Sequence, residues 1–419
     1  MTSLTVLLTV VSTSIMRPMN CDEHTIYEIV EVLVAPNGPS ERQFGKNVEL
    51  IGEWFAVATD SGEDGSLQPG SVHLYEHLEF GWRSGKLLHA PERTWPDEFG
   101  SDMDSSHHRL LVGAPGDSEV DWDSGAAWLY ELRDDWSLIS ALQPKQVESG
   151  ARFGDAVALD GAWAAIGAPR SDGLGIASGA VYIFDGRSGP WTEVQRIEAP
   201  DGASGDFFGD SVALSGRWLA VGSWGDDDRG EKSGSVWIFH HERGKWRPVQ
   251  KIVPQELESR DRFGCSLELS GDWLIVGSSG WNTNQGAIYT FNLDGATWLK
   301  NRRLHSRAGT SQEWLGYSLS VKKGMMVSGV PGRQGEDIMD GGVDLFKLEA
   351  GTWRWIQRVT PSRKDWHQPH QFGWSVTTDG TRILVGRIDD ADGQAEPGRA
   401  WLLENRARAP SVSALISDD

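Results

Sequence analysis

Short apolar segments alternate with turn-forming residues over most of the chain. In one stretch, "FGDSVAL" (208–214) is followed by a Ser-Gly turn, "WLAVG" (218–222), a polar loop, "GSVWIFH" (234–240) and a segment opened by Trp246. Alternating β-branched and aromatic residues bounded by Gly, Asp and Ser are strand signals, and a two-residue turn ending in Gly suits a tight antiparallel hairpin. The pattern therefore predicts four short antiparallel strands.

The same pattern is repeated along the chain, and each copy opens with Phe-Gly or, once, Leu-Gly. Successive copies are 55, 54, 55, 55, 52 and 57 residues apart. The pairs begin at Phe44, Phe99, Phe153, Phe208, Phe263, Leu315 and Phe372. Four-stranded antiparallel units repeated seven times predict an all-β fold, a seven-bladed β-propeller, with an open solenoid as the rival arrangement.

The last copy lacks a fourth strand, because it ends at "GRAWLLEN" (398–405). A strand-like segment, "IYEIVEVLVA" (26–35), precedes the first copy and aligns with the fourth strand at 191–200. We predict that this N-terminal strand completes the seventh blade and closes the ring, since an open edge strand would invite aggregation. A monomer is expected on the same ground.

Composition limits the classes of partner. The chain of 419 residues carries a net charge of −21, which disfavours nucleic acid, and its two cysteines, Cys21 and Cys265, cannot form a disulfide framework. Residues 1–16 are uncharged and apolar like the core of a secretion signal, although they lack a basic flank and a small-x-small cleavage site. No other stretch approaches the length of a membrane span.

The repeat resembles a known family. "FG" followed by "VGAP" (112–115) or "IGAP" (166–169) is similar to the FG-GAP repeat of the integrin α-subunit head propeller and of many secreted proteins, and the resemblance covers residues 26 to about 405. It implies a propeller and a binding role, although one fold hosts many activities. The family's calcium loop between the first two strands is not expected here, because turns such as Asp160-Gly161 leave no room for a cation.

Acidic clusters occur instead between the second and third strands, at 117–123, 226–231 and 389–393. Asp226, Asp227 and Asp228 are the weak candidates for a metal site. Their irregular spacing fits solvated loop charge, with weak calcium binding as the alternative. No other cofactor is indicated.

Six tryptophans depart from the repeat and fall in the long loops. Because second-to-third-strand loops and inter-blade connections leave a blade on the same face, all six are expected on one face as a ligand-binding surface. Inward packing of several of them is the alternative. These residues are Trp95, Trp122, Trp224, Trp281, Trp314 and Trp366.

Catalytic motifs are absent from the sequence. "NLDGATW" (292–298) resembles part of the Asp-box of sialidase propellers in one unit only, and no nucleophile elbow, phosphate loop or HExxH motif occurs. We therefore expect a non-enzymatic, secreted or cell-surface module that binds a protein or a glycan. The alternative is a carbohydrate-active propeller with its site in the central funnel. The expected organisation is a signal or targeting segment at 1–21, the propeller at 22–405 and a tail at 406–419.

Overall fold

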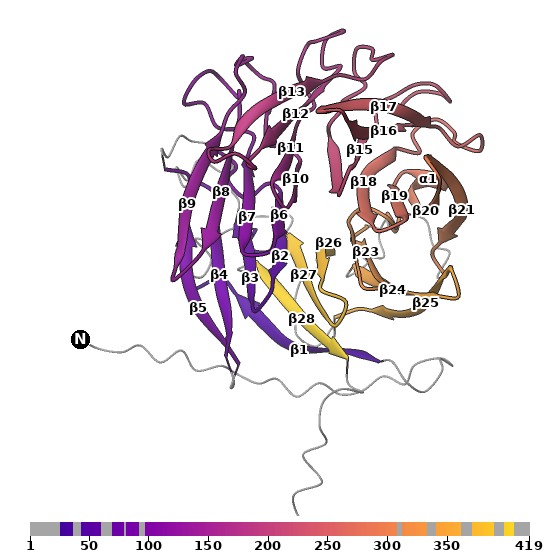
Figure 1. Ribbon diagram of the computed structural model, residues 1–419. Coiled ribbons are helices and arrows are strands. Elements are labelled where there is room, and N and C mark those ends of the chain that lie inside the picture. The colour runs from indigo at the N-terminus through magenta and orange to yellow at the C-terminus, as the bar shows by residue number, and fades with distance from the viewer. Residues whose placement is uncertain are drawn as a thin grey trace, which may run out of the picture.

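The computed structural model describes residues 26–36, 43–59, 69–78, 81–91, 97–307, 312–332, 341–361, 371–388 and 398–405. The signal segment, the tail, the acidic cluster at 389–393 and two of the six loop tryptophans, Trp95 and Trp366, lie outside these residues. Within the described part, the chain forms seven four-stranded antiparallel sheets arranged around a centre (Figure 1). The expected seven-bladed all-β propeller is confirmed.

The first six blades use their strands in chain order from the centre outward, and the seventh adds β1 as its outermost strand (Figure 1). The first strands are β2 (Val48–Ile51), β6 (Met103–Ser106), β10 (Val157–Asp160), β14 (Ser211–Ser215), β18 (Phe263–Ser270), β22 (Leu319–Lys322) and β26 (Gln371–Thr378). The second strands are β3 (Trp54–Thr59), β7 (Arg109–Ala114), β11 (Trp163–Ala168), β15 (Trp218–Ser223), β19 (Trp273–Ser278), β23 (Met325–Val330) and β27 (Arg382–Ile388). The third strands are β4 (Ser71–Leu78), β8 (Ala126–Leu132), β12 (Ala180–Asp185), β16 (Ser235–Glu242), β20 (Ala287–Asp294), β24 (Gly342–Glu349) and β28 (Arg399–Asn405). The fourth strands are β5 (Gly81–Leu88), β9 (Trp136–Leu142), β13 (Thr192–Ile197), β17 (Lys245–Ile252), β21 (Thr297–His305), β25 (Thr352–Val359) and β1 (Tyr27–Val34).

The ring is closed rather than open. Every first strand contacts the first strands of its two neighbours, and β2 of the first blade contacts β26 of the seventh. β1 pairs antiparallel with β28 in the seventh blade, from Tyr27 opposite Asn405 to Val34 opposite Arg399. The predicted closing strand is therefore confirmed. In the described residues the one helical element is the turn α1 (Trp281–Asn284), and no helix is long and apolar enough to cross a bilayer.

The Phe-Gly pair differs from its expected role. In five blades it lies outside the first strand, as a turn against the preceding blade. Gly154 has a φ of +96°, and a Cβ atom there would lie 2.3 Å from the carbonyl oxygen of Ala126. Only glycine fits this approach of two backbones, while the adjacent Phe153 is buried between blades. The repeated pair is thus an inter-blade joint more than a strand start.

The repeated tryptophans of the second and fourth strands also join blades. The first residue of a second strand packs against the Trp at the start of the next blade's fourth strand, as in Trp54 with Trp136 and Trp218 with Trp298, whose ring centroids are 6.1 and 5.6 Å apart. In the second blade, Arg109 stands at the position of the second-strand tryptophan, and its guanidinium carbon lies 6.0 Å from the ring centroid of Trp191 in the third blade. These contacts confirm that the repeated tryptophans are packing residues.

Glutamine side chains also join neighbouring blades, through paired hydrogen bonds that we call the glutamine clamp. Gln195 bonds both the N–H and the carbonyl of Trp246 in the next blade, at 2.9 and 2.8 Å. Gln357 makes the same pair of bonds to Tyr27, both at 2.9 Å. β1 is therefore held by the same contact as the fourth strands β17 and β21, the latter through Gln250 and Trp298.

Replacement of Gln357 by alanine is expected to loosen the closure. The substitution removes two hydrogen bonds to β1 and should lower the free energy of unfolding by about 1–3 kcal/mol. Hydrogen exchange of the β1 and β28 amides, together with a denaturant titration, measures the effect. Gln195→Ala removes the matching contact between the third and fourth blades and serves as the control: it should lower stability similarly without faster exchange in β1. Equal exchange in β1 for the two variants would contradict the clamp.

Candidate functional site

Long loops and short turns leave the propeller on opposite faces. The second-to-third-strand loops and the connections between blades share one face because adjacent strands run antiparallel. We call this the loop face. The described loop tryptophans, Trp122, Trp224, Trp281 and Trp314, all belong to its segments. They do not form one cluster, since each has its own partners.

Apolar side chains are exposed on two neighbouring loops of this face. In the described residues the four most exposed large apolar side chains are Val120, Trp122, Leu174 and Ile176, at 54%, 68%, 54% and 76%. We call these four residues the rim patch. Both loops contact the connection between the second and third blades: the Trp122 carbonyl accepts a hydrogen bond from Gly150, and Glu148 accepts one from the N–H of Asp172. Exposed apolar side chains on neighbouring loops make this part of the loop face a candidate interaction surface.

Trp224 lies at the mouth of the central channel and is packed rather than free. Its ring stacks on Phe207, with centroids 5.0 Å apart and planes at 9°. Lys232 and Arg262 place their charges 5.5 and 5.6 Å from the ring. Phe207 has a φ of +54°, a left-handed conformation that is uncommon for a non-glycine residue.

A second aromatic group comes from the sixth and seventh blades. Trp314 stacks on Tyr317 at 5.9 Å, and Tyr317 contacts Trp374 at 4.6 Å. Tyr317, Trp374 and Trp224 all line the channel. The remaining loop tryptophan, Trp281, lies farther out: it packs on the core between the fourth and fifth blades, with the Arg303 guanidinium 4.5 Å from its ring.

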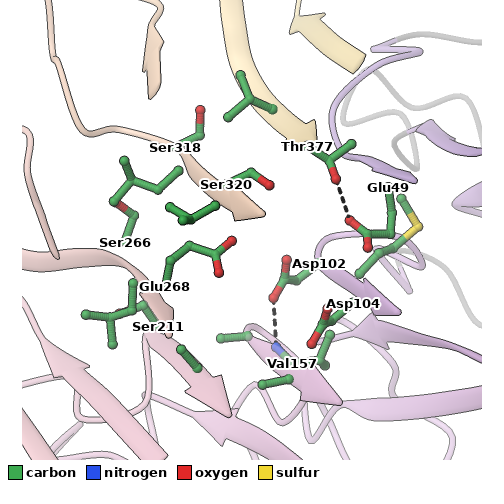
Figure 2. Close-up of a pocket in the computed structure, with 18 of the residues that line it drawn as sticks. Glu49, Asp102, Asp104, Val157, Ser211, Ser266, Glu268, Ser318, Ser320 and Thr377 are labelled. Atoms are coloured by element: carbon green, nitrogen blue, oxygen red, sulfur yellow. Dashed lines mark hydrogen bonds between the residues drawn. The ribbon is translucent and has the colours of Figure 1, made fainter. Parts of the chain in front are cut away.

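The central channel is acidic and encloses about 1040 Å³. Figure 2 shows Glu268 from one side and Glu49, Asp102 and Asp104 from the other, with their carboxylates turned toward the same space. Each comes from a first strand or from the residues just before it.

Backbone N–H groups and hydroxyl groups of neighbouring first strands donate hydrogen bonds to three of these carboxylates. Asp102 and Asp104 accept hydrogen bonds from the N–H groups of Val157 and Leu159, at 2.7 and 2.6 Å. Glu49 accepts from the hydroxyls of Ser105 and Thr377, at 2.7 and 3.0 Å. The channel carboxylates therefore cap the inner edges of adjacent blades.

Burial and mutual repulsion raise the pKa values of this group. Desolvation raises the pKa of Glu49 to about 8, with the charge of Asp104 adding to it. Desolvation likewise raises the pKa of Asp102 to about 7 and that of Asp104 to about 6, and it raises the pKa of Glu268 well above its usual range. Lys322 is the cation that partly offsets these charges. Protonated carboxyls are thus a feature of the channel near neutral pH.

The metal candidates of the fourth blade surround an ammonium group. Lys251 Nζ lies 2.8 Å from Asp226, 2.7 Å from Asp201 and 2.8 Å from Asp228. Asp226 is buried, whereas Asp227 and Asp228 are exposed. In the described residues, no group of three or more His, Cys, Asp or Glu side chains is arranged to hold a metal ion. The ammonium group of Lys251 occupies the place among these carboxylates that a metal ion would take.

Sequence reasoning missed the residues that approach the axis. Tyr317 and Trp374 lie two positions after the first residue of the Phe-Gly pair, whereas Glu49, Asp104 and Glu268 lie five positions after it. An alignment of the seven copies by these positions would have shown both groups. Whether the acidic or the aromatic side chains of different copies lie together still depends on how the seven blades are arranged in the ring.

The comparison with protein families agrees with this architecture. The FG-GAP repeat family model matches residues 136–184, 191–239 and 246–291. Each match begins within one residue of the start of the fourth strand of one blade and ends in the third strand of the next. The chain carries FG-GAP repeats in a seven-bladed β-propeller, and this class of repeat fits a protein-binding module. A search of curated proteins finds none that matches.

Proposed function

We propose that this protein is a non-enzymatic binding module, secreted or displayed at the cell surface, that engages a protein or glycan through its loop face. The rim patch is the observation that carries the proposal. Four large apolar side chains on two adjacent loops are each more than half exposed. Exposure of apolar side chains to water is unfavourable, and binding of a partner that covers them regains this free energy.

The scaffold suits this role because it holds the loops rigidly. Glu148 ties the third-blade loop to the preceding connection through the hydroxyl of Ser171 and the N–H of Asp172. The Trp122 carbonyl is fixed by the N–H of Gly150, at 2.7 Å, and by the hydroxyl of Ser149, at 3.2 Å. Pre-organised loops lose little conformational entropy on binding.

The acidic channel supports a second candidate, a carbohydrate-active propeller. Glycoside hydrolysis uses one protonated and one ionised carboxyl group, and the channel holds Asp104 and Glu49 with pKa values raised to about 6 and about 8. Aromatic rings at the mouth could stack on a sugar. A panel of glycosidase substrates separates the two functions, because turnover would favour the enzyme and binding without turnover the module.

Trp122→Ala combined with Ile176→Ser is expected to weaken ligand binding at least tenfold with little change in stability, since both side chains are largely exposed. Labelled protein applied to a glycan array and to intact cells measures binding. Leu138→Ala combined with Val194→Ala changes partly exposed apolar residues on the outer strands β9 and β13 and is the matched control. Equal loss in both pairs, or none in the first, would contradict a rim-patch site.

A further inference from the structure

Carboxylates alternate with apolar side chains on the second-blade loop of the rim patch. Residues 119–123 read Glu-Val-Asp-Trp-Asp, so Val120 and Trp122 each stand between two acids. Glu119 and Asp121 are exposed, as are the two apolar side chains. This loop therefore presents apolar contact area and negative charge at the same place.

The third-blade loop of the rim patch has the same combination. Asp172, Leu174 and Ile176 occupy alternate positions, and all three are exposed. The N–H of Ile176 donates to the hydroxyl of Ser204, at 3.1 Å, and its carbonyl accepts a hydrogen bond from the N–H of Gly205, at 2.9 Å. Since the preceding connection holds the other side of the loop, its side chains are in position before a partner binds.

The carboxylates of these two loops lack a cationic partner within the chain. In the described residues no lysine, arginine or histidine forms an ion pair with the four acids that reach solvent here, Glu119, Asp121, Asp123 and Asp172. Arg152, at the end of the connection between the two blades, is taken up by Glu98 and Asp155, which lie 2.7 and 3.0 Å away. The negative charge around the rim patch is therefore open to a cation from outside.

The side chains of the rim patch favour a protein over a glycan. Sugar rings stack on flat aromatic faces, and the patch offers one such face, the indole of Trp122. Its other three side chains are aliphatic. The carboxylates would repel an anionic glycan and would gain no ion pair from a neutral one. A peptide segment with lysine or arginine between apolar residues matches both the aliphatic side chains and the charge.

We propose that the rim patch binds a basic, apolar segment of a partner protein. This assignment rests on the proposed function and narrows its ligand from a protein or glycan to one class. The apolar side chains of the segment cover the rim patch, and its cations lie against Glu119, Asp121 and Asp172. Burial of apolar area supplies the affinity, while opposite charges speed association and exclude partners of the wrong sign.

Subtractive selection from a random dodecapeptide library displayed on phage tests the assignment. The library is first passed over the immobilised patch variant, Trp122→Ala combined with Ile176→Ser, and the unbound phage are then selected on the full parent chain. Both proteins have the same net charge, so the first step removes peptides that bind any acidic surface. The recovered peptides should be basic, with lysine or arginine next to apolar residues, and should bind the parent at least tenfold more tightly than the patch variant.

A charge variant measures the electrostatic part with a synthetic peptide of the selected consensus. Glu119→Gln combined with Asp121→Asn keeps an oxygen to accept the hydrogen bond from the Trp122 N–H, and it should bind about three- to tenfold more weakly at about 50 mM NaCl. The difference should shrink at about 0.5 M NaCl, because salt screens exposed charges. Asp272→Asn combined with Asp294→Asn removes two exposed charges from turns of the opposite face and should bind like the parent.

The outcomes separate this assignment from the proposed function. Neutral or acidic peptides from the selection, no peptide that depends on the rim patch, or equal affinity of the charge variant and the parent would overturn the basic partner. A glycan that binds the parent and not the patch variant would overturn it too, while leaving the rim patch as the binding site. Glycan and cell binding that is equal in the parent and the patch variant would instead contradict the proposed function itself.

Discussion

Deletion of residues 22–36 is expected to lower the melting temperature by roughly 5–10 °C and to promote the formation of oligomers. The deletion removes β1, whose Tyr27 and Leu33 side chains are buried in the seventh blade. Burial of these two side chains alone contributes about 3–6 kcal/mol. The deletion also exposes the edge of β28, whose Trp401 and Leu403 side chains are buried in the full chain.

Differential scanning calorimetry and size-exclusion chromatography measure the two effects. A synthetic peptide of residues 26–36, added in excess, should restore both the melting temperature and the monomer, because it can pair with β28 as β1 does. A scrambled peptide is the control. A deletion variant that melts like the full chain and stays monomeric would show that the ring does not depend on this strand.

Glu49→Gln is expected to stabilise the protein at pH 8 and to flatten its dependence on pH. The pKa of Glu49 is raised from 4.5 to about 8. The folded protein therefore keeps a proton that the unfolded chain loses, and the free energy of unfolding falls as pH rises from about 4.5 to about 8. Glutamine resembles the protonated side chain, so the loss with rising pH should largely disappear.

The gain at pH 8 should be about 2–4 kcal/mol, allowing for partial exposure of the side chain to the channel. Below pH 4.5 the variant and the parent chain should be equally stable. Urea titrations at a series of pH values measure this, and Glu119→Gln, on an exposed loop residue, is the control with no expected change. A variant that is destabilised at every pH would mean that the Glu49 carboxylate is needed as an ion.

Most of the fold was predictable because the signals are local and repeated. "WLAVG" and its copies become second strands such as β15. The turns between first and second strands lie one residue later than the predicted Asp160-Gly161 and Ser215-Gly216, because Asp160 and Ser215 still pair as the last residues of β10 and β14. The closing strand was predictable because residues 26–35 match a fourth strand that the last copy lacks. The Phe-Gly pair was misplaced in most blades, since the approach of the neighbouring backbone at Gly154 is a contact between units.

The site was only partly predictable. Sequence position placed Trp122 on the loop face, but its 68% exposure, against the packed rings of Trp224 and Trp281, follows from contacts with other blades. Asp226 was recognisable as an acidic loop residue. Its pairing with Lys251 required the register between the fourth strand and a loop some 25 residues earlier.

The sequence by itself determined the strands, their grouping in fours, the number of blades and the way the ring closes, because each depends on period-two alternation, turn residues and the regular spacing of copies. The tertiary structure alone decided which side chains meet. Glu49 and Glu268 share a channel because closure of the ring brings equivalent positions of different copies to one axis. The distances between side chains across the ring depend on how all seven blades pack together. The sequence of a single repeat therefore does not determine them.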